Sequence, residues 1–177
     1  RAAADDDLAA LGAELFGGGS DTASGASRDN PFADYRFDYV SQGEEAVERI
    51  KAAQEAGDPY ATLFLDMRMP PGIDGLETAR RVRELDSAIN IVVVTGYSDH
   101  NPQKIAKVAG PLDKLYYLSK PFRTADVQQL AQSLASKWQM EAKLRSANQR
   151  LEHANVELQA SEARARHVAL HDQLTQL

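Results

Sequence analysis

The amino-acid sequence predicts an α/β protein built on a parallel β-sheet, and three observations support this fold class. Short apolar runs occupy residues 61–65, 91–94 and 115–118, with the length and composition of buried strands. Segments with helix start and stop signals separate these runs. Each run ends in a polar residue followed by a turn or loop. Strands that alternate with helices form βαβ units, although periodicity alone leaves a buried helical segment open for residues 61–65.

The composition excludes several classes of function. The chain has 177 residues, enough for one domain and an extension, and 43% of them are hydrophobic. Its net charge of −6, without a Lys/Arg-rich run, argues against a nucleic-acid partner. The absence of cysteine excludes disulfides and thiolate chemistry and fits the cytoplasm, where we expect the protein. No apolar run is long enough for a membrane span.

The N-terminal part contains a predicted helix, a loop and an edge strand. Residues 5–16 are rich in Ala and Leu, with leucines on one helical face. Residues 17–34 are rich in Gly, Ser and Asp and are expected to form a loop without a core of its own. Residues 35–39 alternate aromatic and charged side chains, which predicts an edge strand with one solvated face.

Helix starts are marked by capping residues. Ser41 and Glu44 have the spacing of a capping box, which predicts a helix beginning beside them. Asp74 has the same kind of capping position before the next amphipathic segment. Pro102 suits the first position of a further helix, and Gly110 suits its end.

The residues best suited to take part in a chemical reaction lie at the strand ends. The apolar runs end in Asp66, Thr95 and, after Ser119, Lys120. The carboxyl ends of parallel strands share one edge of the sheet, where ligands bind, so these side chains are expected to converge. A carboxylate nucleophile, a hydroxyl donor and an ammonium suit the acceptance of a phosphoryl group. Taken singly, each residue also fits a purely structural role at a strand end or as a turn cap.

Three motifs resemble the receiver domain of two-component response regulators. They are LFLDMRMPPGIDG, IVVVTGYS and YYLSKPF, in the order of that family, and the resemblance covers about residues 35–138. It implies a flavodoxin-like, doubly wound parallel sheet with strand order 2-1-3-4-5. It also implies that Asp66 is the phosphoacceptor, Thr95 the switch hydroxyl and Lys120 the phosphate partner.

The resemblance implies further site features and partners. Tyr117 matches the switch aromatic residue, and the peptide bond between Lys120 and Pro121 is expected to be cis. Mg²⁺ is the implied cofactor, held by Asp66 and the backbone carbonyl of Arg68. The implied phosphodonor is a histidine kinase or a phosphotransfer protein.

Two departures from the family pattern are visible. The loop between Asp66 and Gly75 is one residue longer than the common form and carries an extra proline. The first strand of the family and its acidic pair, which carry most of the Mg²⁺ site, are missing from the sequence. We therefore expect Asp66 in this chain to be phosphorylated inefficiently.

A continuous helical pattern extends from residue 125 towards the end of the chain. Leu144, Leu151 and Leu158 recur every seven residues, which predicts a coiled coil and a homodimer. With Leu at heptad position a, position d holds small residues such as Ala147. With Leu at d, position a holds Asn148, where a buried Asn favours a parallel dimer. Both registers remain open.

Residues 167–177 resemble the opening of a GGDEF domain, which typically starts with a His-Asp-x-Leu-Thr-x-Leu phrase. Here the phrase reads HDQLTQL. The resemblance implies that the parent protein is a diguanylate cyclase that makes cyclic-di-GMP, with a phosphodiesterase domain as a possible addition. The Gly-Gly-Asp-Glu-Phe loop is not in the sequence, so no cyclase chemistry is expected from these residues themselves.

The sequence therefore predicts four segments. They are an N-terminal helix and loop (1–34), a receiver body (35–138), a coiled-coil linker (139–166) and the start of a GGDEF domain (167–177). The expected function is a phosphorelay receiver that controls an output domain through a dimeric coiled coil. Two alternatives stay open: a degenerate receiver that acts as a dimerisation scaffold, and the receiver of a hybrid histidine kinase.

Overall fold

The structure is a computed structural model that describes residues 35–96 and 102–174, with side chains described for 35–96 and 103–164. The chain divides into two compact units, Arg1–Trp138 and Gln139–Leu177. The helix predicted at 5–16 and the loop predicted at 17–34 lie outside the described residues.

Within the described residues, the sheet has three parallel strands in the order β1-β2-β3. Their bounds are β1 (Thr62–Asp66), β2 (Asn90–Thr95) and β3 (Leu115–Ser119). These are the strands that the apolar runs predict, and their parallel pairing confirms the predicted class of sheet. The register places Asp66 beside Val94 and Thr95 beside Ser119, so the strand ends share one edge.

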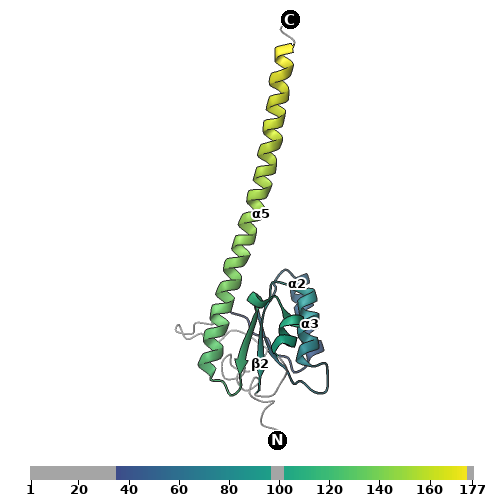
Figure 1. Ribbon diagram of the computed structural model, residues 1–177, viewed down its shortest axis with the longest axis vertical. Coiled ribbons are helices and arrows are strands. Elements are labelled where there is room, and N and C mark those ends of the chain that lie inside the picture. The colour runs from purple at the N-terminus through teal and green to yellow at the C-terminus, as the bar shows by residue number, and fades with distance from the viewer. Residues whose placement is uncertain (1–34, 97–101, 175–177) are drawn as a thin grey trace. The chain divides into compact units, whose positions relative to one another are not determined.

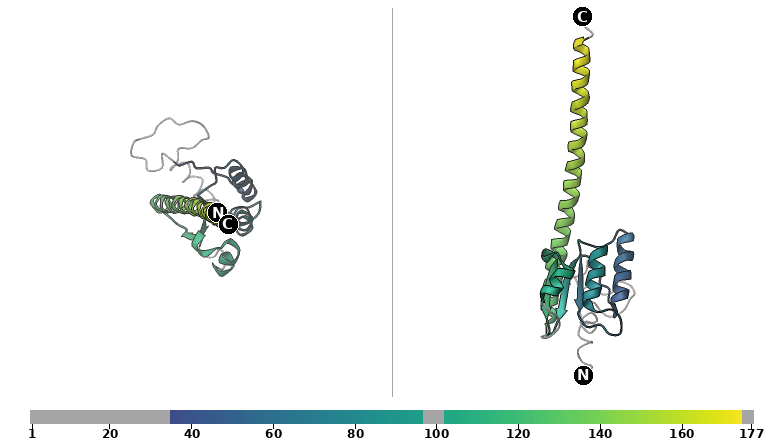
Figure 2. Two further views of the ribbon diagram at one scale, coloured as in Figure 1. Left: turned by 90° about the horizontal axis from the view of Figure 1, so that it is seen from above. Right: turned by 45° about the vertical axis from the view of Figure 1, so that its right-hand side comes forward.

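Helices cover both faces of the sheet (Figure 1). Helix α2 (Gly43–Glu55) precedes β1. The elements between the strands are α3 (Gly75–Leu85), α4 (Pro102–Ala109) and the short 3₁₀ helix η1 (Leu112–Lys114). The predicted long C-terminal helix is α5 (Thr124–Leu174). Helices α2 and α3 lie side by side on one face, and the first turns of α5 lie on the other (Figures 1 and 2). No helix within the described residues combines the length and the apolar character that a membrane crossing needs.

The alternation of side chains along the strands divides the core between the two faces. Leu65 of β1 and Val93 of β2 belong to the buried cluster that Ile50, Val82 and Ile105 complete from α2, α3 and α4. The next residues along β2 point to the opposite face because successive strand residues alternate. The four residues 91–94 are fully buried, which fits a strand that is covered on both faces.

Asn90 fastens β2 to its neighbours at the start of the strand. Its side chain is fully buried, and its Nδ2 donates to the carbonyl oxygens of Ala61 at 3.0 Å and Leu134 at 3.2 Å. Leu134 belongs to the first turns of α5. A buried amide that meets two backbone acceptors thus fixes α5 against the strands within the first unit.

The predicted edge strand at residues 35–39 is wrong, because the structure has no strand there. A strand needs a neighbour for its backbone groups, and within the described residues β1 pairs only with β2. Side chains hold this segment instead. Arg36 Nη1 lies 2.5 Å from Asp58 Oδ2, and its guanidinium lies 5.1 Å from the ring centre of Tyr60, whose hydroxyl donates to Asp38. The alternation of aromatic and charged residues therefore reflects these side-chain contacts and not the backbone hydrogen bonding of a β-strand.

The capping box predicted at Ser41 is also wrong. The N-cap of α2 is Gln42, and its side chain makes no capping hydrogen bond. The carboxylate of Glu44 accepts a hydrogen bond from the backbone N–H of Ile73, 3.1 Å away. The predicted cap of α3 is confirmed, because Asp74 Oδ1 accepts from the N–H of Glu77 at 2.8 Å.

Candidate functional site

The carboxyl edge of the sheet brings Asp66 and Lys120 into direct contact. The Nζ atom of Lys120 donates to Asp66 Oδ2 at 2.6 Å. Asp66 ends β1, and Lys120 follows directly after β3, with β2 between them. Their side chains are 16% and 18% exposed, so the pair is mostly shielded but reachable from solvent. The predicted convergence of these two strand ends is confirmed.

The second oxygen of the Asp66 carboxylate is held by the chain that follows it. The backbone N–H of Arg68 donates to Asp66 Oδ1 at 3.0 Å. The carboxylate is therefore oriented by a hydrogen bond from its own loop and an ion pair from the far strand. An ionised carboxylate has about four lone-pair positions, so these two bonds leave capacity for another ligand.

Thr95 ends β2 between the two members of this pair. Its hydroxyl donates to the carbonyl oxygen of Gly96 at 2.8 Å, and its own carbonyl accepts from the backbone N–H of Lys120 at 2.9 Å. The backbone bond ties the residue that carries the ammonium to the end of β2. The single hydroxyl proton of Thr95 is directed to Gly96 in this structure.

Tyr117 lies on β3, the edge strand of the described sheet. Its side chain is 43% exposed, and burial of the remainder raises the pKa of its hydroxyl. The peptide bond between Lys120 and Pro121 is cis, as expected from the family resemblance.

Gly75 allows the start of α3 to approach Asp66. A Cβ atom at this position would lie 2.4 Å from the carbonyl oxygen of Asp66 and 2.7 Å from the Cα of Met67. The backbone N–H of Gly75 donates to the carbonyl of Met67 at 3.3 Å. The chain therefore leaves the strand, forms the loop 67–74 and returns to pack directly on the strand end.

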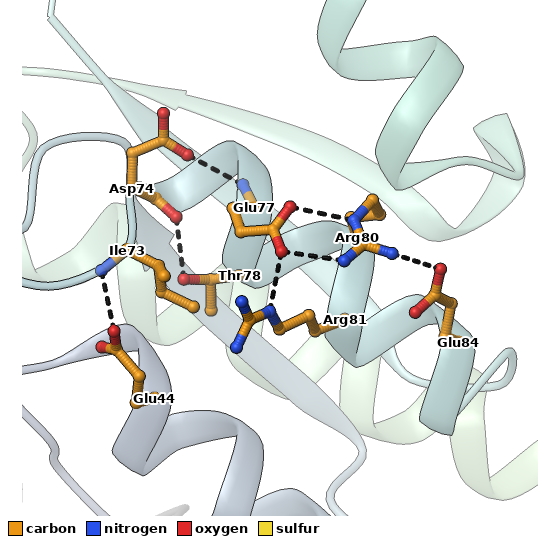
Figure 3. A network of polar contacts seen from close by, with 8 residues as sticks. All are labelled: Glu44, Ile73, Asp74, Glu77, Thr78, Arg80, Arg81 and Glu84. Atoms are coloured by element: carbon orange, nitrogen blue, oxygen red, sulfur yellow. Dashed lines mark hydrogen bonds and ion pairs between the residues drawn. The ribbon is translucent and has the colours of Figure 1, made fainter.

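Two residues at the start of α2 contact the loop beside this site, Gln42 at the N-cap and Glu44 in the first turn. Gln42 Oε1 accepts from the N–H of Gly72 at 3.1 Å, and Glu44 Oε1 accepts from the N–H of Ile73 at 3.1 Å. Figure 3 shows Glu44 reaching from α2 to the loop that precedes Asp74. The spacing of the polar run Ser41-Gln42-Gly43-Glu44 predicts a local cap, whereas the side chains of Gln42 and Glu44 bond to the loop.

The described residues offer few ligands for the Mg²⁺ ion that the family resemblance implies. Within them, no group of three or more His, Asp or Glu side chains is placed to hold a metal ion. Mg²⁺ takes six oxygen ligands, of which waters commonly supply several. Asp66, with its spare lone pairs, and the carbonyl of Arg68 fit two of these positions, and the other ligands would come from outside the described residues or from solvent.

Comparisons with known proteins identify a family. Residues 32–132 match the family model of the response regulator receiver domain. The chain is 32% identical over 101 residues to the response regulator receiver protein CpdR of Brucella abortus (strain 2308), covering 54% of this chain and 72% of CpdR. It is 43% identical over 68 residues to the cyclic di-GMP phosphodiesterase response regulator RpfG of Xanthomonas campestris pv. campestris (strain 8004). That match covers 37% of this chain and 17% of RpfG.

A solved structure supports the fold. The signal receiver domain of a Luxo repressor protein from Vibrio parahaemolyticus superposes with a TM-score of 0.51 and 15% sequence identity. The superposition covers 77% of this chain and 88% of that chain. At 15% sequence identity, this structural similarity supports the fold and nothing further.

Proposed function

This chain belongs to the response regulator receiver domain family, and we propose that it accepts a phosphoryl group on Asp66 and relays the change to an output domain. The observation that carries the proposal is the distance of 2.6 Å between Lys120 Nζ and Asp66 Oδ2 at the carboxyl edge of the parallel sheet. The contact joins an oriented carboxylate nucleophile to a cation, and solvent reaches both.

The proposed reaction is an in-line phosphoryl transfer. A carboxylate oxygen of Asp66 attacks the phosphorus of a phosphohistidine on a histidine kinase or phosphotransfer protein. The new O–P bond makes an acyl phosphate, the P–N bond breaks, and the leaving imidazole takes a proton from solvent. The ammonium of Lys120 stabilises the charge on the phosphoryl oxygens. Thr95 contributes when its hydroxyl exchanges the Gly96 carbonyl for a phosphoryl oxygen.

Mg²⁺ is part of the proposal as the expected cofactor. Asp66 and the carbonyl of Arg68 would hold it, and the bound ion would supply positive charge to the transferring phosphoryl group. Tyr117 is proposed as the aromatic residue whose surroundings change after phosphorylation, because it lies half-exposed on the strand that leads to Lys120.

The second unit is proposed as a dimeric coiled-coil linker. Leu144, Leu151 and Leu158 are 61%, 63% and 58% exposed in the single chain and recur at heptad spacing. Such a row of exposed leucines on one helix is stabilised by a second copy that buries it. Changes at the Asp66 site would then alter how two output domains face each other.

The proposed output is cyclic-di-GMP metabolism, and specifically a diguanylate cyclase that begins at residues 167–177. The phrase HDQLTQL supports the cyclase. The similarity to RpfG, a cyclic di-GMP phosphodiesterase response regulator, supports only the link to cyclic-di-GMP. Detection of cyclic-di-GMP synthesis by the parent protein, and its dependence on Asp66, tests this part separately from phosphorylation.

A second candidate is a receiver that serves only as a dimerisation scaffold. The observation in its favour is that the described residues bring no group of three acidic or histidine side chains together to hold a metal ion. Under this alternative, Asp66 and Lys120 form a structural ion pair and no phosphoryl group is accepted.

The deciding experiment measures phosphoryl incorporation. The whole chain is incubated with acetyl phosphate and Mg²⁺, and intact mass spectrometry follows the gain of one phosphoryl group that hydroxylamine removes. We expect a slow gain, in line with the inefficient phosphorylation that the sequence predicts, in the unsubstituted chain and in Asp58→Asn, an exposed aspartate beyond the opposite end of β1. We expect no gain in Asp66→Asn. A folded chain that gains no phosphoryl group would favour the scaffold function.

A further inference from the structure

We infer that Gln42 and Glu44 are positioning residues for Asp66, which they serve by clamping the loop 67–74. The inference rests on the proposed function of Asp66. Gln42 and Glu44 stand at the N-terminus of α2, and Gly72 and Ile73 supply the two loop N–H groups that they hold. These four residues are called the loop clamp.

The loop clamp uses two consecutive backbone donors. Gly72 donates to Gln42 Oε1 and Ile73 donates to Glu44 Oε1, each at 3.1 Å. A bond from a backbone N–H to a carboxylate is charge-assisted and stronger than a neutral one. Two bonds from adjacent residues fix the direction of the chain as well as its position.

The hydrogen bonds of the loop clamp are exposed, and close packing at the buried Gly43 holds the loop against α2 beneath them. A Cβ atom on Gly72 would lie 2.4 Å from Glu44 Oε2 and 2.8 Å from Gln42 Oε1. A Cβ atom on Gly43 would lie 2.1 Å from Thr78 Oγ1 and 2.7 Å from Ile73 Cγ1. The loop therefore lies directly against α2, and α2 directly against α3.

The sequence of the loop explains why it needs outside support. Pro70 and Pro71 have no backbone N–H, so the middle of the loop has few donors of its own. The near end is anchored by Met67, which is 1% exposed, and the far end by the Asp74 cap on α3. The loop clamp holds the part between the prolines and that cap, and Figure 3 shows its bond between Ile73 and Glu44.

The consequence for the site lies at Arg68. Its N–H donates to Asp66 Oδ1 at 3.0 Å, and its carbonyl is the proposed metal ligand. Three residues separate Arg68 from Gly72, and two of them are prolines with a restricted φ, so a shift of the clamped segment is transmitted to Arg68 through a short and stiff stretch of chain. The loop clamp thus holds the Asp66 carboxylate and the Arg68 carbonyl in the orientation needed for phosphoryl transfer. Small misplacements of such groups lower the rate of the transfer.

The first test measures how well the loop amides are protected from exchange and involves no phosphorylation. Backbone amide hydrogen exchange is followed by NMR in Glu44→Ala and Glu44→Gln, since the Gln amide oxygen can still accept from Ile73. We expect exchange at Ile73 and Arg68 to become about tenfold faster in Glu44→Ala and to stay within about twofold in Glu44→Gln. Glu48→Ala removes an exposed carboxylate from the same helix and is the matched control, for which no change is expected.

The second test reads the reaction. Phosphorylation of Asp66 by acetyl phosphate is expected to be about tenfold slower in Glu44→Ala and unchanged in Glu48→Ala. In Glu44→Gln, whose neutral amide oxygen accepts a weaker hydrogen bond, the rate is expected to stay within about twofold. An Arg68 amide that exchanges at the original rate in Glu44→Ala would overturn the inference, and so would an undiminished rate of phosphorylation. If the unsubstituted chain accepts no phosphoryl group, the proposed function of Asp66 fails, while the exchange rates alone still decide whether the loop clamp holds Arg68.

Discussion

Lys120 holds its ammonium nitrogen 2.6 Å from Oδ2 of Asp66, although the two residues are 54 positions apart in the sequence. The parallel sheet makes this contact possible, because β1 and β3 flank β2 and all three strands end at one edge. The backbone N–H of Lys120 is also bonded to the carbonyl of Thr95 at 2.9 Å. The ion pair is therefore fixed from the backbone as well as from the side chains.

Removing the ammonium tests its proposed role in transfer. Lys120→Ala is expected to slow phosphorylation of Asp66 by about 100-fold, because the phosphoryl oxygens lose their nearest cation. The measurement is the rate of phosphoryl incorporation from acetyl phosphate. Lys104→Ala, which removes an exposed lysine from α4, is the control and is expected to leave the rate unchanged. Equal rates in both variants would contradict the role of Lys120.

Substitution of Gly75 is expected to disturb both stability and the site. In Gly75→Ala the new methyl group meets the carbonyl of Asp66 at 2.4 Å, so the strand end or α3 must shift, at a cost of about 1–3 kcal/mol. Urea unfolding gives the stability, and the NMR signal of the Arg68 amide reports on the site.

Gly57→Ala is the comparison for Gly75→Ala. Gly57 has a φ of +74° and no neighbour within 4 Å of a Cβ atom, so alanine there costs about 1 kcal/mol through backbone strain alone. We expect lower stability with an unchanged Arg68 signal. A site signal that moves equally in both variants would contradict the steric argument for Gly75.

Arg83 is expected to be a major source of stability at the opposite edge of the sheet. Its guanidinium nitrogens lie within hydrogen-bond distance of five backbone carbonyls, and three of these carbonyls share the two N–H groups of Nη1. The five belong to Ala109, Asp86, Ser87, Ile89 and Lys114. Burial lowers the pKa of Arg83, which reflects the cost of placing a charge among carbonyl groups without full hydration. Arg83→Ala is expected to reduce the free energy of unfolding by about 2–3 kcal/mol, because these acceptors lose their donor.

The matched control for Arg83 is Arg81→Ala on the same helix. The Arg81 side chain is 43% exposed and forms an ion pair with Glu77 at 2.7 Å. An exposed pair of this kind contributes up to about 1 kcal/mol, so the loss is expected to be smaller. Both losses are measured by urea unfolding at neutral pH. Equal losses would show that the carbonyl contacts of Arg83 add nothing beyond an ordinary surface charge.

Glu77 is expected to give the fold a dependence on acid pH. Hydrogen bonds from Arg80 and Arg81 lower the pKa of Glu77 from 4.5 to about 2. Because the folded state holds the proton less tightly than the unfolded state, the contribution of Glu77 is complete above pH 4.5. It is lost as the pH falls from 4.5 towards 2.

Substitution isolates this contribution. Glu77→Gln is expected to have a shallower fall in stability between pH 4.5 and 2 than the unsubstituted chain, as measured by urea unfolding at a series of pH values. The difference is expected to shrink in high salt, since the side chain is 34% exposed. Parallel pH profiles for the two proteins would contradict the assignment.

The leucine row on α5 is expected to drive dimerisation. Leu151→Asp is expected to weaken the dimer by about 100-fold or more, because a charge replaces a buried leucine in both copies. Val156→Asp is the control, since Val156 is equally exposed at 65% but lies off the leucine row. Sedimentation equilibrium measures both dissociation constants. A dimer equally weakened by both substitutions, or one that resists both, would contradict a leucine seam.

The sequence alone determined the three strands of the described sheet, their parallel arrangement and the identity of the residues at its carboxyl edge. Apolar runs such as 91–94 identify buried strands because burial on both faces selects apolar residues throughout. Asp66 and Lys120 were predictable as neighbours because parallel topology alone sends both strand ends to the same edge. The cap at Asp74 was predictable because it is a contact between residues three positions apart.

Tertiary structure decided which partners the polar side chains take. Glu44 was expected to bond within its own helix turn, yet its carboxylate holds Ile73, 29 positions away. Arg83 forms hydrogen bonds with backbone carbonyls that come together only after α3, α4 and the strands have packed. Residues 35–39 have the pattern of a strand but no neighbouring strand in the described sheet. Apolar patterns respond to burial, which is local and periodic, whereas a hydrogen-bond acceptor is satisfied by whichever donor the folded chain brings to it.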